Sequence, residues 1–130
     1  MNFKTLMIIK AVVCLCLGVP ILLATIFAYS LFGATLTAGG VFAAREYGAS
    51  LIGNMLLTWF ARNAIESEAR RAIILALCVY DAIGFVITLI AQLSGVLGPL
   101  GWFGMAIYLF FAIGFGYFLI PQKKVAKVTV

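Results

Sequence analysis

The chain has 130 residues, of which 65% are hydrophobic and 10% are charged, and its net charge is +5. This balance excludes an ordinary soluble domain, whose surface must carry charged and polar side chains. The basic residues stand at the ends of apolar runs and form no stripe with exposed aromatics, which argues against nucleic-acid binding. We therefore expect one membrane domain over residues 1–130.

The first apolar run covers residues 11–33 and follows Lys4 and Lys10. A basic start before an apolar stretch is typical of a signal peptide, but this run has the length of about 20 residues that a membrane span needs. Further apolar runs also follow it. We therefore predict a retained span, with a kink or a loosened turn at Pro20, since proline removes a helix hydrogen bond.

The second run covers residues 43–61 and is followed by a charged linker over residues 62–71. Asn63 and Glu66 in this linker have the spacing of a capping box. This pattern predicts a polar first turn that runs directly into the third span, over residues 72–93. The fourth span is predicted over residues 101–120, ending before Pro121. The predicted fold is an all-α, antiparallel bundle of four transmembrane helices.

The distribution of positive charge predicts the orientation. With four spans, both termini and the middle linker share one side of the membrane. That side holds Lys4, Lys10, Arg62, Arg70, Arg71, Lys123, Lys124 and Lys127. The other side holds Arg45. Because short cytoplasmic segments are enriched in Lys and Arg, we expect both termini in the cytoplasm of a bacterium and the chain in its plasma (inner) membrane.

Asp81 is the residue most expected to have a special role. It lies about 15 Å along the third span from Arg71, which places a carboxylate near mid-membrane, where acids are rare and often functional. Asn54 lies at a matching depth in the second span, about 12 Å from Arg62. We predict that Asn54 and Asp81 approach each other. They would form either an interhelical hydrogen bond, of order 1 kcal/mol, or a proton or ion site.

Two further residues complete a candidate intramembrane polar site of Asp81, Asn54, Arg45 and Gln92. Arg45 could reach inward to pair with Asp81 or Gln92. Alternatively, Arg45 and Glu46 extend to the membrane interface, as long charged side chains commonly do.

Other chemistry has little support in the sequence. The chain has no histidine, the commonest general base and zinc ligand, and its three cysteines lie in apolar segments. Cys14 and Cys16 would point about 200° apart on a helix, which does not suit a metal. No phosphate-binding loop or nucleophile elbow is present in the sequence. We expect no enzyme activity, cofactor or metal.

Five short segments resemble those of a group of short, mostly uncharacterised bacterial four-span membrane proteins. They are Arg45-Glu46-Tyr47-Gly48-Ala49, Trp59-Phe60-Ala61-Arg62-Asn63, Ser67-Glu68-Ala69-Arg70-Arg71-Ala72, Ala91-Gln92-Leu93-Ser94-Gly95 and Gly114-Phe115-Gly116-Tyr117-Phe118. The resemblance implies the four spans but no activity. Small multidrug exporters are similar only in size, since residues 11–33 lack the acidic residue of their first span.

Two functions follow as expectations. The first is an accessory or structural subunit that packs against other membrane subunits or a copy of itself, within a larger assembly such as a respiratory or photosynthetic complex. The alternative is a subunit of a small proton- or ion-coupled transporter or channel that uses Asp81. The expected partners are the lipid bilayer and membrane proteins, with no nucleic acid.

Overall fold

The computed structural model describes residues 1–120, and every regular element in that range is a helix. The expected all-α class is therefore confirmed. Three of the helices, at Phe3–Leu23, Glu68–Leu93 and Gly101–Leu119, are long and apolar enough to cross a membrane. The elements are α1 (Phe3–Leu23), α2 (Thr25–Leu31), α3 (Ala38–Ala61), α4 (Glu68–Leu93) and α5 (Gly101–Leu119).

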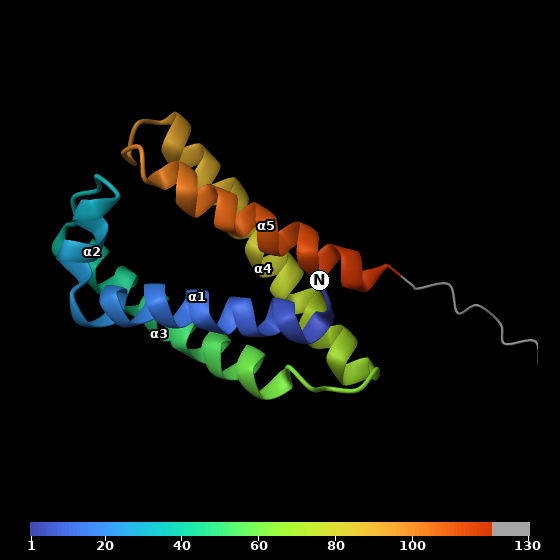
Figure 1. Cartoon of the computed structure of the whole chain (residues 1–130). Helices are drawn as coiled ribbons and strands as arrows, with labels where there is room; N and C mark the ends of the chain where they lie inside the picture. Colours follow the sequence, from blue (N-terminus) through green and yellow to red (C-terminus); the bar gives the residue numbers. More distant parts are fainter. Residues whose placement is uncertain (121–130) are drawn as a thin grey trace, which may run out of the picture.

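The long helices form two antiparallel pairs (Figure 1). Helix α1 packs along α3, and α4 packs along α5. The two pairs meet near the N-terminal part of α1 and diverge away from it, and α2 lies toward their open end. The arrangement is therefore a wedge of two pairs set at an angle, instead of the expected single bundle.

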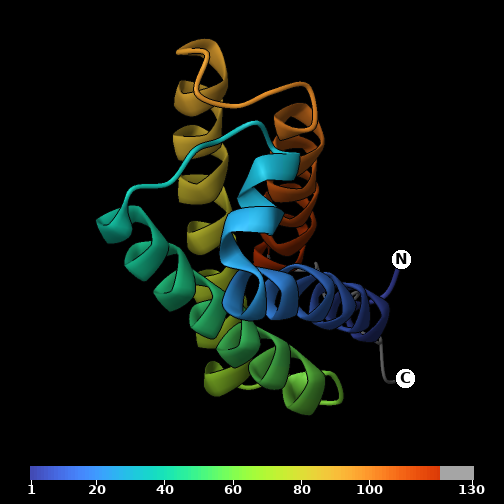
Figure 2. The ribbon, with the colours of Figure 1, turned by 90° about the vertical axis from the view of Figure 1, so that its left-hand side faces the viewer.

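The first expected span, over residues 11–33, is not one continuous helix, because its residues belong to two helices, α1 and α2. Helix α1 begins at Phe3, where the Asn2 side chain accepts a hydrogen bond of 2.8 Å from the Thr5 backbone N–H. It ends at Leu23, and Ala24 interrupts the helical conformation with φ −131° and ψ 55°. Helix α2 then turns away from the α1 axis (Figure 2). The direction changes at Ala24, whereas Pro20 stays inside α1.

The later helices are closer to expectation. The predicted capping box is wrong, because the N-cap of α4 is Ser67, whose hydroxyl accepts a hydrogen bond of 3.2 Å from the Arg70 backbone N–H. The expected polar first turn that continues into the third helix is confirmed, since α4 begins at Glu68. Helix α3 begins at Ala38, before the predicted start of the second span. Pro121 and the basic tail lie outside the described residues.

Two hydrophobic clusters form the core. One joins the two helix pairs where they meet and consists of Phe3, Leu6, Met7, Ile74, Leu77, Phe111 and Phe115. The other lies between α1, α2 and α3 and consists of Cys14, Ile21, Ala28 and Leu51. Within the α1–α3 pair the backbones approach closely at Gly48, where a Cβ atom would lie 3.0 Å from the backbone nitrogen of Leu22.

A backbone hydrogen bond connects the two helix pairs at the end of the wedge where they diverge. The N–H of Gly98, in the turn between α4 and α5, donates a hydrogen bond of 2.7 Å to the Phe32 carbonyl oxygen after α2. The adjoining Gly33 has φ +74°, and a Cβ atom there would lie 2.9 Å from the Gly98 nitrogen. Glycine at residue 33 therefore serves both the left-handed backbone and the close approach. This contact joins the two pairs at their far ends.

Candidate functional site

A buried ion pair links α1 to α4. The Lys10 ammonium donates a hydrogen bond to Oδ1 of Asp81, and the two side chains are 4% and 0% exposed. Lys10 was expected among the charges at the membrane edge, and that placement is wrong. Its long side chain instead brings a cation to the one acid in the interior of α4.

Two aromatic rings lie beside the ammonium group of Lys10. Lys10 Nζ lies 4.5 Å from the centroid of the Phe111 ring and 5.3 Å from that of the Tyr80 ring. Ring faces attract a cation that has lost its water. Oδ2 of Asp81 is buried and has no hydrogen-bond partner among the described residues. The site is therefore electrically balanced but leaves one carboxylate oxygen free.

The expected approach of Asn54 to Asp81 is wrong. Asn54 is half-buried on α3, and α3 packs along α1, whereas α4 packs along α5. Matching depths along α3 and α4 do not by themselves bring Asn54 and Asp81 into contact, because the two helices must also be neighbours. Asp81 pairs with Lys10 instead.

Arg45 and Gln92 also lie apart from Asp81. Arg45 is exposed on α3, as is Glu46, which agrees with the outward alternative, and their extension to a membrane interface stays a prediction. The Gln92 amide donates hydrogen bonds to the carbonyl oxygens of Leu97 (3.4 Å) and Gly98 (3.3 Å). Gln92 therefore holds the turn between α4 and α5, and the four candidate residues do not form one site.

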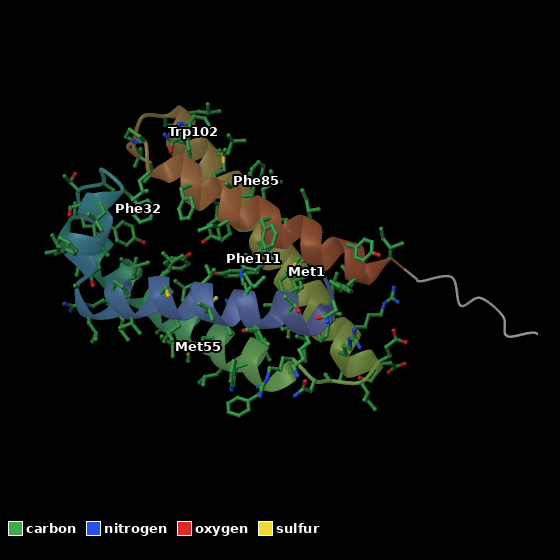
Figure 3. All side chains as sticks on the ribbon, in the orientation of Figure 1. Met1, Phe32, Met55, Phe85, Trp102 and Phe111 are labelled. Carbon is green, nitrogen blue, oxygen red and sulfur yellow. The ribbon has the colours of Figure 1, made fainter. Side chains whose placement is uncertain are left out.

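A cavity of about 500 Å³ lies between the two helix pairs. Its walls are mostly apolar side chains from all five helices, such as Leu17, Ile83 and Ile107, and Lys10 also lines it. Figure 3 shows Phe32, another lining residue, near the open end of the wedge, and Phe111 between α1 and α5. A cavity of this size falls in the range of small-molecule binding sites.

Four tyrosines supply most of the polar atoms of the cavity: Tyr29, Tyr47, Tyr80 and Tyr108. The Tyr47 and Tyr108 hydroxyls share a hydrogen bond between α3 and α5. The Tyr80 ring lies 6.4 Å from that of Tyr108, centroid to centroid. The Tyr80 hydroxyl oxygen is buried and lacks a partner within residues 1–120.

Gly84 makes room for this cluster. A Cβ atom at Gly84 would lie 2.4 Å from the Tyr108 ring, so α4 accommodates the ring only because residue 84 has no side chain. Sequence reasoning missed the tyrosine cluster and Lys10. Their signal is a set of polar side chains inside apolar runs, but spacing along the chain does not reveal which of them meet.

The described residues contain no group of histidine, cysteine and acidic side chains that could hold a metal ion. No known protein family matches the chain, and no significant match exists among curated proteins or solved structures. The resemblance to short four-span bacterial proteins therefore stays a prediction.

Proposed function

We propose that the chain is a non-catalytic, multi-pass protein of the bacterial plasma (inner) membrane and serves as an accessory subunit of a larger membrane assembly. In this proposal α3, with 24 residues, is a fourth crossing beside α1, α4 and α5. Its length supports this, since about 20 residues span the hydrocarbon core.

The orientation proposed has both termini in the cytoplasm. Lys10 no longer counts toward the charge bias, because it is buried in an ion pair. Seven basic residues still fall on the side of the termini: Lys4, Arg62, Arg70, Arg71, Lys123, Lys124 and Lys127. Arg45 falls on the other side. The remaining excess supports the same orientation.

The outward face of α3 is the feature that supports an accessory role. Ala49, Ser50 and Gly53 are exposed there, and a Cβ atom at Gly53 would meet no atom within 4 Å. Small residues on a membrane helix allow a second helix to approach closely. A face of this kind favours a protein neighbour over lipid, either another subunit or a second copy.

Gly53→Leu is expected to release the chain from its partner, because the new side chain would occupy the space of the neighbouring helix. The fold of the single chain should be retained, since nothing lies near the Gly53 Cβ position. The measurement is the mass of the complex purified in mild detergent. Ala82→Leu, at an exposed small residue of α4, is the matched control and should leave the mass unchanged.

Two results would contradict the accessory role. One is recovery of the unsubstituted chain at the mass of a single copy in mild detergents. The other is an equal loss of complex in the Gly53→Leu and Ala82→Leu variants, which would remove any special role of the α3 face.

A second candidate function is a proton- or ion-coupled subunit that uses Asp81. It is favoured by the free Oδ2 atom of Asp81 and by the position of Lys10, which both pairs with Asp81 and lines the cavity. Ionisable residues inside transmembrane helices commonly mark proton or ion pathways.

On this second candidate, Asp81→Asn should abolish proton uptake by proteoliposomes that contain the purified complex. The Lys10→Met/Asp81→Leu variant should also lack uptake, and it separates loss of function from an unpaired charge because both partners are replaced. Unchanged uptake in Asp81→Asn, together with a lower Tm, would rule the transport function out.

A further inference from the structure

The cavity between the helix pairs is a half-open space that the side chains of the chain do not fill. Its volume is about 500 Å³, and apolar side chains form most of its walls. Voids of that size forfeit the packing contacts of every residue around them. Water is a poor occupant for mostly apolar walls, because each water molecule needs two or more polar partners.

The charge of the cavity indicates a neutral occupant. Lys10 is the charged residue among the described residues that line it, and its ammonium is already neutralised by Asp81. An anionic ligand would have to compete with the Asp81 carboxylate, and a cationic ligand would meet the Lys10 ammonium. A ligand without net charge avoids both costs.

The tyrosine hydroxyls indicate hydrogen-bond acceptors on that occupant. The Tyr47 and Tyr108 hydroxyls share one hydrogen bond, which uses one of their two protons and leaves the other free to donate. The Tyr80 hydroxyl is buried close to this pair, and no partner lies within hydrogen-bond distance of it among the described residues. Two phenolic donors therefore lie beside a mostly apolar cavity, where an unmet donor is unfavourable.

We propose that this cavity binds a neutral amphiphile whose head group carries carbonyl oxygens. The carbonyl oxygens accept hydrogen bonds from Tyr80 and from the Tyr47–Tyr108 pair, and the hydrocarbon part contacts Leu17, Ile83 and Ile107. Two membrane sources share this chemistry: an isoprenoid quinone and an acylglycerol. The site is independent of the accessory role proposed above.

The test uses the full chain purified in mild detergent and native mass spectrometry to count bound molecules. The probes are decylbenzoquinone, dioctanoylglycerol and decylbenzene, the last of which has no carbonyl. We expect one carbonyl probe per chain and weaker binding of decylbenzene. Tyr80→Phe and Tyr108→Phe should each weaken carbonyl-probe binding about fivefold, the effect of one lost hydrogen bond.

One cavity-filling variant and one control variant test whether the probes bind in this cavity. Gly104 lines the cavity, and the nearest atom to its Cβ position, on Phe32, is 3.7 Å away, so Gly104→Leu would project into free space. It should abolish binding. Ala106→Leu, at an exposed residue of the same helix, should bind as the unsubstituted chain does.

Stronger binding of decylbenzoquinone would assign the site to a quinone, and stronger binding of dioctanoylglycerol would assign it to an acylglycerol. The proposal is overturned if decylbenzene binds as tightly as the carbonyl probes, if the tyrosine variants bind unchanged, if Gly104→Leu retains binding, or if no probe binds. These outcomes leave the mass of the complex, which tests the accessory role, unaffected.

Discussion

Lys10→Met is expected to lower the free energy of unfolding by about 3–5 kcal/mol, the usual effect of removing one partner of a buried ion pair. The substitution keeps the length of the side chain but leaves the Asp81 carboxylate in an apolar core without its cation. Asp81→Leu should have a similar effect through the unpaired ammonium. Thermal or denaturant unfolding of the detergent-solubilised chain measures both.

The combined Lys10→Met/Asp81→Leu variant should recover most of that loss, because no buried charge remains to be compensated. Lys4→Met, at an exposed position of the same helix, is the matched control and should change stability by no more than about 0.5 kcal/mol. If the combined variant were as unstable as the sum of the single variants, Lys10 and Asp81 would not be coupled and the ion pair would be disproved.

Gly48→Ala is expected to destabilise the chain by about 1–3 kcal/mol, the range for overpacking a close contact. The new Cβ atom would lie 3.0 Å from the Leu22 backbone nitrogen and 3.2 Å from the Leu22 Cα atom. Because these are backbone atoms, relief requires α1 and α3 to move apart, and this separation also disturbs the packing of Ile21 and Leu51. Unfolding in detergent again measures the effect.

Gly53→Ala is the matched control for this prediction, since both glycines lie inside α3. A Cβ atom at Gly53 meets nothing nearby, so the substitution should be neutral or stabilise by up to about 1 kcal/mol through helix propensity. Equal stability of the two alanine variants would show that α1 and α3 do not approach at Gly48.

The interruption of the first apolar run illustrates what a hydropathy pattern misses. Residues 11–33 are uncharged and mostly apolar, and their hydropathy does not mark Ala24 as the point where α1 ends. The interruption lets Ala28 of α2 pack against the α1–α3 pair, and the turn after α2 then reaches Gly98. Pro20 indicated the region but not the residue.

The partner of Asp81 is a second feature that the sequence pattern did not predict. The position of Asp81 in the interior of the third predicted span followed from the rise of a helix. Its partner did not follow, because depth says nothing about which helices are neighbours. Lys10, Tyr47 and Tyr108 come from α1, α3 and α5, and only the packing of the two helix pairs brings them beside α4.

Composition and hydropathy alone predicted the helical class, the apolar character of α1, α4 and α5, the end of α4 and the extent of α5. These properties depend on composition and on local sequence signals, which act over a few residues. The wedge of two pairs, the Lys10–Asp81 ion pair and the tyrosine-lined cavity depend on tertiary packing. Each of these joins residues far apart in the chain, and their contacts depend on how side chains pack between helices at a given crossing.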